Sequence, residues 1–182
     1  PVAADYTLDG KKSLMTPEMI FTYSSKGKGQ ATRNLHYWAR NHQILDGKSK
    51  RHILLNSWEG VRMNVTQTGM NSMMDDFAAL GGEMFVMDDG WFGYRNDDRS
   101  SLGDWQVNEE KLGGTLAQLI ERINALGLKF GIWYEPEMIS RDSNLYRAHP
   151  DWCLHVPNRE KSIGRHQYVL DYSRQDVRDY IF

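Results

Sequence analysis

The sequence predicts an α/β fold in which parallel strands alternate with helices, as in an incomplete (β/α) barrel of the TIM type. Three short apolar runs, at 53–55, 85–87 and 129–133, are separated by segments with helical periodicity. This alternation indicates βαβ units with right-handed crossovers. Each run also ends in polar, aromatic or acidic residues, at the strand end where such folds bind ligands. Because a barrel needs eight units and three or four are evident, we expect the chain to be part of a larger protein.

The central run is residues 83–92, with the sequence EMFVMDDGWF. Its apolar half suits a buried strand of a parallel sheet, and it is too short for a helix. Asp88 and Asp89 cannot belong to that buried part, since two adjacent charges need water or a polar ligand. Gly90 lets the chain turn, and Trp91 adds a flat apolar face. We therefore expect the carboxyl end of this strand to open onto a pocket.

Two helices are predicted between the strands. The first buries a face of Met70, Met73, Met74, Phe77 and Leu80, which we interpret as core, and it stops at Gly81 and Gly82. The second begins with a capping box from Thr115 to Gln118 and ends at Gly127. A fourth extended run at 167–171 and a helix capped by Ser173 and Asp176 end the chain.

The first 50 residues differ from the rest. Residues 1–30 contain two strand-like pieces, 2–8 and 19–23, joined by a turn from Asp9 to Lys12 and followed by a flexible joint at 24–30, which predicts the end of a β-rich domain. Residues 31–50 form a linker helix and loop, with a packed stripe of Leu35, Trp38, Ala39 and His42. Residues 51–182 then form the first part of the barrel.

Composition excludes several classes of function. A net charge of −2 gives no electrostatic reason to expect nucleic acid or an anionic membrane as a partner. No apolar stretch approaches the ~18 residues of a membrane span. The single cysteine, Cys153, allows no internal disulfide and fits a reducing, cytoplasmic compartment. We predict no metal, because the spacing of His149, Cys153, His155 and His166 matches no metal motif, and no cofactor, because no phosphate-binding glycine loop is present.

Carboxylates beside tryptophans indicate carbohydrate as the ligand. Aromatic faces stack on sugar rings, and carboxylates accept hydrogen bonds from hydroxyls. Asp88 and Asp89 are candidates to bind hydroxyls, but adjacent strand residues point to opposite faces and make a poor acid and nucleophile pair. A helix cap or a loop salt bridge is the alternative for both. Trp58 and Trp133 end strands, and core packing is the alternative for them.

Glu135 and Glu137 flank Pro136 and leave two interpretations open. Their carboxylates either order the loop by accepting hydrogen bonds from backbone amides or contact the substrate directly. The sequence favours neither.

Four blocks carry a family resemblance: MDDGWFGYRNDDRSSLGDWQVNEEKL, LGLKFGIWYEPEMIS, LYRAHPDWCLHV and GRHQYVLDYSRQDVRDYI. They resemble the bacterial α-galactosidases of glycoside hydrolase family 36, from about Leu54 to Phe182. Residues 1–50 resemble the end of that family's N-terminal β-sandwich domain and the helical linker into its barrel. The resemblance implies a retaining hydrolase of terminal α-1,6-linked galactose in melibiose and raffinose, without a cofactor and commonly tetrameric.

The resemblance also assigns roles to residues. Asp88 and Asp89 would bind the galactose hydroxyls, Trp58 and Trp133 would wall the subsite, and Arg165 would reach the sugar. Ser57 stands where the family usually has Asn before its Trp-Glu pair, a mild departure. The family's nucleophile lies in a Lys-Trp-Asp block and its acid/base is a later aspartate. Neither block occurs here, so we expect no catalytic residue within the chain and place both beyond Phe182.

Three hypotheses therefore compete. The chain is part of an α-galactosidase, part of a barrel glycosidase with a different sugar specificity, or a non-catalytic module for sugar binding or assembly. The preferred aglycone and the oligomeric state cannot be read from the sequence.

Overall fold

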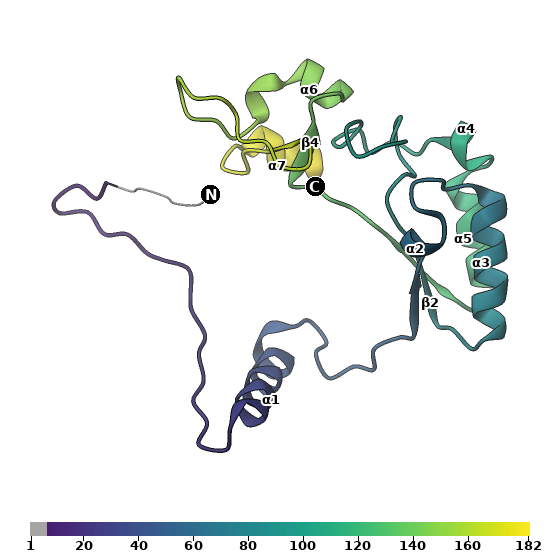
Figure 1. Ribbon diagram of the computed structural model, residues 1–182, viewed down its shortest axis with the longest axis horizontal. Helices are drawn as coiled ribbons and strands as arrows, with labels where there is room; N and C mark the ends of the chain where they lie inside the picture. Colours follow the sequence, from purple (N-terminus) through teal and green to yellow (C-terminus); the bar gives the residue numbers. More distant parts are fainter. Residues whose placement is uncertain (1–6) are drawn as a thin grey trace. The chain divides into compact units, whose positions relative to one another are not determined.

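The computed structural model describes residues 7–182, and the chain divides into two compact units between Arg51 and His52. The first unit contains helix α1 (Lys28–Trp38) and the π-helical segment η1 (Ala39–Gln43) that continues it. The second unit contains all the described strands and the remaining helices. Figure 1 follows the chain through these elements in order.

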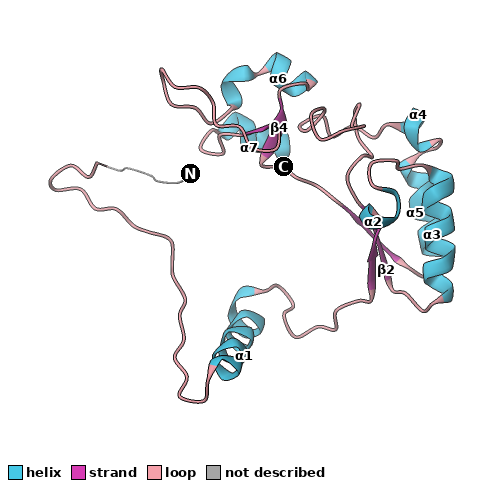
Figure 2. Ribbon diagram, in the orientation of Figure 1, coloured by secondary structure: helices cyan, strands magenta, loops and turns pink. Residues whose placement is uncertain are grey.

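The predicted strand at 19–23 does not form. Residues 13–24 have no regular secondary structure and are drawn as loop in Figure 2. The turn between the two predicted strands is present, since the Lys12 amide donates to the Asp9 carbonyl oxygen at 3.1 Å. Residues 2–6 of the other strand-like piece lie outside the described residues. A strand needs a partner for its backbone groups, and residues 7–51 supply none, so the strand expected at 19–23 is not seen in the described residues. The assignment of residues 1–30 to the end of a β-rich domain stays a prediction.

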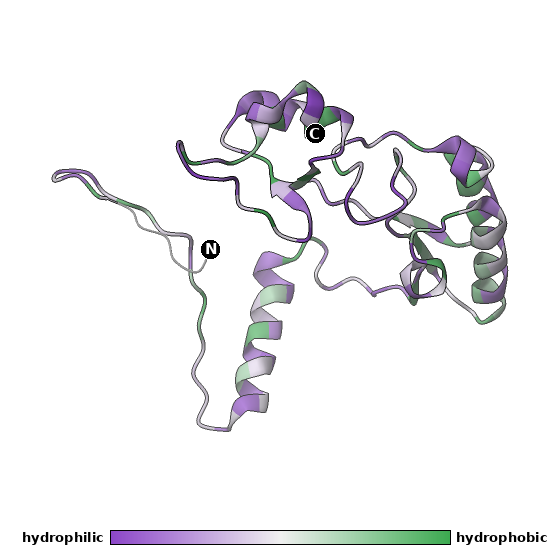
Figure 3. Ribbon diagram, turned by 45° about the horizontal axis from the view of Figure 1, so that its top comes forward, coloured by the Kyte–Doolittle hydropathy of each residue, from purple (hydrophilic) through white to green (hydrophobic). Residues whose placement is uncertain are grey.

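Helix α1 forms where a helix was predicted, but its stripe is not packed within its own unit. It contains no buried residue, and Leu35 is 39% exposed. Figure 3 shows hydrophobic and hydrophilic residues around the same helix. The helix was therefore predicted correctly. Its apolar face, however, is not buried by any other part of residues 7–51.

A parallel sheet is the centre of the second unit. Its strands are β1 (Leu54–Asn56), β2 (Met84–Met87) and β3 (Lys129–Ile132), in the order β1-β2-β3. Both pairings are parallel, with β2 in the middle. The α/β fold with parallel strands and crossover helices is therefore confirmed.

The crossovers carry the predicted helices together with two short ones. Between β1 and β2 lie α2 (Trp58–Val61) and α3 (Gln67–Ala79), and between β2 and β3 lie α4 (Glu109–Leu112) and α5 (Leu116–Ala125). Helix α5 begins with the predicted capping box, in which Thr115 and Gln118 each bond the other's backbone amide. Helices α3 and α5 lie side by side along the sheet (Figure 1).

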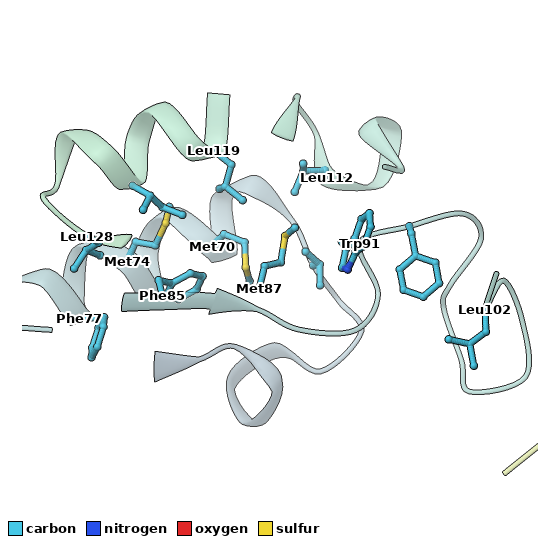
Figure 4. Close-up of a cluster of buried hydrophobic side chains, with 13 residues drawn as sticks. Met70, Met74, Phe77, Phe85, Met87, Trp91, Leu102, Leu112, Leu119 and Leu128 are labelled. Carbon is cyan, nitrogen blue, oxygen red and sulfur yellow. The ribbon is translucent and has the colours of Figure 1, made fainter. Parts of the chain in front are cut away.

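The main core lies between these two helices and the sheet. In Figure 4 the side chains of Met70, Met74 and Leu119 point toward β2, which carries Phe85 and Met87. All five are fully buried, and Met73 is partly buried and packs against the same core, so the interpretation of the three methionines as core residues is confirmed. Leu80 was expected on the same face but is 86% exposed, because α3 ends at Ala79 and the chain turns away there.

The last part of the chain forms a second, smaller core. Strands β4 (Met138–Ser140) and β5 (Gln167–Val169) pair with each other antiparallel. Helices α6 (Asn144–Ala148), η2 (Pro150–Trp152) and α7 (Gln175–Ile181) complete it. Its buried residues include Ile139, Leu145, Trp152, Leu170 and Val177.

Two expectations for this region are corrected. The extended run from Gln167 is a strand, but it pairs antiparallel with β4 and does not extend the parallel sheet. Ser173 does not cap α7, whose first turn follows Arg174. The Ser173 hydroxyl instead donates to the Asp171 carboxylate at 2.6 Å, which takes it out of reach of the helix amides.

Candidate functional site

A pocket of about 690 Å³ opens at the carboxyl ends of the three parallel strands. It brings together the five residues that the sequence nominated as ligand-binding: Trp58 after β1, Asp88 and Asp89 after β2, Trp133 after β3, and Arg165 from the turn before β5. The other lining residues are Asn56, Glu59, Tyr134, Glu135 and Glu137. Residues far apart in the sequence meet here because the strands run parallel.

Asp88 is held by the neighbouring strand. Its carboxylate accepts a hydrogen bond from the Asn56 side-chain amide at 2.5 Å, and its own backbone amide donates to the Ser57 hydroxyl at 3.0 Å. The same Asn56 side chain accepts from the Trp58 amide at 2.8 Å. Asn56 therefore orients the Asp88 carboxylate and also holds Trp58, the first residue of α2. Asn56 was not nominated, although its place at a strand end beside Trp58 was a usable signal.

Asp89 forms a buried ion pair with Arg95. Nε of Arg95 donates to Oδ1 of Asp89 at 2.9 Å, and Nη2 donates to Oδ2 at 2.8 Å. Arg95 is fully buried, and Asp89 is 3% exposed. The loop salt bridge considered for this aspartate is thus present, and Asp89 also lines the pocket. Sequence reasoning missed Arg95, because a loop arginine six residues away gives no local sign of its direction.

The chain just after the carboxylates is fixed by Lys111 and Gly90. Nζ of Lys111 donates to the carbonyl oxygens of Gly90, at 2.8 Å, and of Arg95, at 2.7 Å. Burial lowers the pKa of Lys111, Asp89 opposes that shift, and Arg95 adds to it. Gly90 has φ +109°, and a Cβ there would lie 2.7 Å from the Met63 backbone. Only glycine fits this turn without a shift of the backbone.

Aromatic rings form one wall of the pocket and the packing behind it. The Trp133 amide continues the β3 ladder by donating to Met87 O at 2.8 Å, and its carbonyl oxygen accepts from the Trp91 indole at 2.9 Å. Trp105 packs against Tyr134 with ring centroids 4.3 Å apart. Trp133 is half-buried, so it packs on the core and still faces the pocket. The two interpretations of this residue are therefore compatible.

Arg165 reaches the pocket from a strained turn. Gly164 and Gln167 exchange two backbone hydrogen bonds, of 3.1 and 2.9 Å, across the two residues between them. Arg165 has φ 49° and His166 has φ 62°, so both adopt the left-handed conformation of a type I′ turn. This conformation costs non-glycine residues about 1–2 kcal/mol each. Strain of this kind is concentrated at functional sites.

Glu135 has a carboxylate oxygen without a partner. Its Oε2 is buried and makes no hydrogen bond within residues 7–182. Burial raises the pKa of Glu135, Arg165 opposes that rise, and Glu137 adds to it. A carboxylate oxygen that ordered the loop would accept a hydrogen bond from a backbone amide. This oxygen therefore favours the second of the two interpretations, a contact with a bound molecule.

The residues weighed as metal ligands have other surroundings. Within the described part of the chain, no group of three or more His, Cys, Asp or Glu side chains is placed to hold a metal ion. His149 stacks on Trp152 with ring centroids 4.0 Å apart, and Cys153 is buried, which raises the pKa of its thiol. In residues 7–182 no helix has the length and apolar character needed to cross a membrane.

Comparison with known proteins identifies the family. The melibiase family model matches residues 13–182. The chain belongs to the melibiase family. It is 48% identical over 180 residues to the bifunctional α-galactosidase/sucrose kinase AgaSK of Mediterraneibacter gnavus, which is 97% of this chain and 19% of that protein. It is 47% identical over 183 residues to the α-galactosidase AgaA of Geobacillus stearothermophilus, covering all of this chain and 25% of that protein.

Solved structures of this melibiase family have the same fold. A variant of the G. stearothermophilus family 36 enzyme AgaA in complex with raffinose superposes with a TM-score of 0.79 at 50% identity. The match covers 83% of this chain and 21% of that one. Another AgaA variant was solved in complex with stachyose. The chain thus spans about a fifth to a quarter of the length of these relatives.

The strained turn generates a stability prediction. His166→Gly removes the side chain from a residue in the left-handed conformation, which relieves about 1–2 kcal/mol of backbone strain. Part of this gain is lost because glycine has more conformational freedom in the unfolded chain. We expect the free energy of unfolding to rise by up to about 1 kcal/mol, measured by urea denaturation. Ser162→Gly, in the same loop without a positive φ, is the control and is expected to lower stability. Equal losses in both variants would contradict the assigned strain.

Glu135 generates a pH prediction. A raised carboxyl pKa means that the native state binds this proton more tightly than the unfolded state. Stability therefore falls as the pH rises from about the ordinary value of 4.5 through the raised native pKa. Glu135→Gln cannot lose that proton, so its stability relative to the parent should increase between pH 4 and pH 7. Thermal unfolding at several pH values measures this, with exposed Glu121→Gln as the control. A difference that does not change with pH would refute the assignment.

Proposed function

We propose that this chain is the galactose-binding part of a retaining α-galactosidase that removes terminal α-1,6-linked galactose from melibiose- and raffinose-type oligosaccharides. The observation that carries the proposal is the grouping of two carboxylates, two tryptophans and an arginine in one pocket. Membership of the melibiase family supports it. The relatives solved with raffinose and stachyose support the class of substrate.

The pocket chemistry suits a galactose ring. Ionised Asp88 and Asp89 accept hydrogen bonds from hydroxyls, and charge-assisted bonds of this kind are stronger than neutral ones. Trp58 and Trp133 offer flat faces to the apolar side of a sugar, and Arg165 adds hydrogen-bond donors to the same pocket. Galactose and glucose differ only in the direction of the 4-hydroxyl, so fixed acceptors can distinguish them. The carboxylates therefore account for both affinity and specificity.

The catalytic carboxyl groups belong elsewhere in this proposal. A retaining glycosidase needs an acid and a nucleophile about 5–5.5 Å apart on opposite sides of the scissile bond. Asp88 is bound to Asn56, and Asp89 is bound to Arg95, so both carboxylates are committed to a fixed orientation. No Lys-Trp-Asp block occurs in the sequence. We assign the chain sugar binding and place the nucleophile and the acid/base in sequence beyond Phe182.

The architecture of the larger protein is part of the proposal. Residues 51–182 would be the first part of a (β/α)8 barrel in which β1, β2 and β3 are neighbouring strands. Residues 1–30 would end an N-terminal β-rich domain, and 31–50 would link it to the barrel. We further propose a cytoplasmic homotetramer, with an α-galactoside as the small-molecule partner and neither nucleic acid nor membrane.

Binding of galactose and glucose to the chain tests the proposal. We expect isothermal titration to show galactose binding and at least tenfold weaker binding of glucose. Asp88→Asn and Asp89→Asn should each weaken galactose binding by about tenfold or more, because each removes a charge-assisted acceptor worth about 1.5–3 kcal/mol. Asp98→Asn, in the loop beyond the pocket, is the control and should bind as the parent does.

The alternatives give different results in the same experiment. Equal binding of both sugars would favour a barrel glycosidase of different specificity. Galactose binding that survives both aspartate substitutions would contradict the site. A chain that binds galactose but, when joined to the rest of its protein, supports no hydrolysis of an aryl α-galactoside would favour a non-catalytic sugar-binding module.

A further inference from the structure

We infer that Arg95, which does not line the pocket, is a positioning residue that orients the Asp89 carboxylate for the sugar. The inference rests on the proposed function, because it explains how one of the galactose acceptors is held. Neither the sequence pattern nor the comparisons with known proteins assign a role to Arg95. Arg95 is suited to this role by its geometry, its burial and its anchoring.

The geometry is that of a fork meeting a carboxylate. Nε of Arg95 donates to Oδ1 of Asp89 at 2.9 Å and Nη2 donates to Oδ2 at 2.8 Å, and Nε also contacts Oδ2 at 3.2 Å. Such a bidentate pair fixes the plane of the carboxylate as well as its position. A lysine would supply the same charge at one point and leave the carboxylate free to rotate. The orientation of Asp89 therefore depends on the guanidinium and not on charge alone.

Burial makes the pair persistent. The Arg95 side chain is 0% exposed, and that of Asp89 is 5% exposed. Separating the pair would leave two charges in a site with little access to water, which is costly. In the pair of Arg122 and Asp75, one nitrogen, Nη2, donates to both carboxylate oxygens at 2.6 and 2.8 Å, and both side chains are almost half exposed. Water competes for the hydrogen bonds of this exposed pair, so it serves as a comparison for the buried pair of Arg95 and Asp89.

Arg95 is itself anchored on its other side. Its Nη1 donates to the Ser100 carbonyl oxygen at 2.8 Å, and its own carbonyl oxygen accepts from Lys111 Nζ at 2.7 Å. The Arg95 amide donates to Phe92 O at 3.1 Å. Lys111 also bonds Gly90, the residue after Asp89. The loop from 93 to 101 is thus tied to the chain immediately after the carboxylate.

The pair leaves acceptor capacity for a ligand. A carboxylate has about four lone-pair sites. Oδ1 of Asp89 accepts only from Nε of Arg95, whereas Oδ2 accepts from Nη2 and, at 3.2 Å, from Nε as well, so Oδ1 keeps a site free for a ligand. The remaining site on Asp89 is held in a fixed direction at the edge of the pocket. Because this orientation is set before the sugar arrives, the sugar does not have to order the side chain on binding. Arg95 thereby increases affinity through Asp89 without touching the ligand.

A double-mutant cycle tests this mechanism. We expect Arg95→Lys to weaken galactose binding by about tenfold, and to have little further effect in a chain that already carries Asp89→Asn. Arg95→Lys combined with Asp88→Asn should instead show nearly the full loss from each change. Arg122→Lys is the matched control, since it alters an exposed arginine–aspartate pair, and it should leave binding unchanged. A general loss of structure would weaken binding equally in all backgrounds.

The outcomes separate this inference from the proposed function. Parent-like galactose binding by Arg95→Lys, or equal losses in the Asp88 and Asp89 backgrounds, would overturn the inference and leave the proposed function standing. Absence of galactose binding by the parent chain would overturn both.

A second measurement needs no substitution at Arg95. In the ¹⁵N-labelled parent chain, the Nε–H resonance of Arg95 should shift when galactose is added, because the sugar shares the acceptor that this donor binds. The Nε–H resonance of Arg122 should stay in place. An unmoved Arg95 resonance at saturating galactose would contradict the inference even if Arg95→Lys does not fold.

Discussion

Two adjacent carboxylates at the end of a buried strand are the constraint on which the rest of the second unit depends. Asp88 and Asp89 are 9% and 3% exposed, so each needs partners close by. Asp88 finds them at the end of β1, and Asp89 finds Arg95 in the loop after β2. The strand ends and the loop are consequently held in one arrangement.

The same constraint shapes the pocket. The Asn56 side chain donates to the Asp88 carboxylate and accepts a hydrogen bond from the Trp58 backbone amide. The position of Trp58 is therefore linked to that of Asp88. On the other side of β2, the carbonyl oxygen of Trp133 accepts from Trp91. Hydrogen bonds therefore fix a tryptophan on each side of β2: Trp58 through Asn56, and Trp133 through Trp91. The hydrogen bonds that hold Asp88 therefore also hold Trp58 at the wall of the pocket.

The sequence predicted those features that depend on local pattern. The three apolar runs predicted the parallel strands, and Thr115 with Gln118 predicted the start of α5. The grouping of Trp58, Asp88, Asp89 and Trp133 followed from their places at the strand ends, whereas Arg165 was nominated through the family resemblance alone. Long-range features could not be predicted: alternating side chains do not reveal that β5 pairs antiparallel with β4, and nothing near Arg95 indicates its partner. Residues 19–23 have strand composition but no strand to pair with in residues 7–51.

A crystal structure of the chain with bound galactose would show whether the pocket at the ends of β1–β3 holds the sugar through Asp88 and Asp89. We expect one galactose in this pocket, with its 4-hydroxyl within hydrogen-bonding distance of Asp88 or Asp89 and its ring against Trp58 or Trp133. The Asp89 carboxylate should keep its bidentate contact with Arg95. A galactose bound elsewhere, or one whose hydroxyls contact neither aspartate, would contradict the assignment of this pocket as the galactose site.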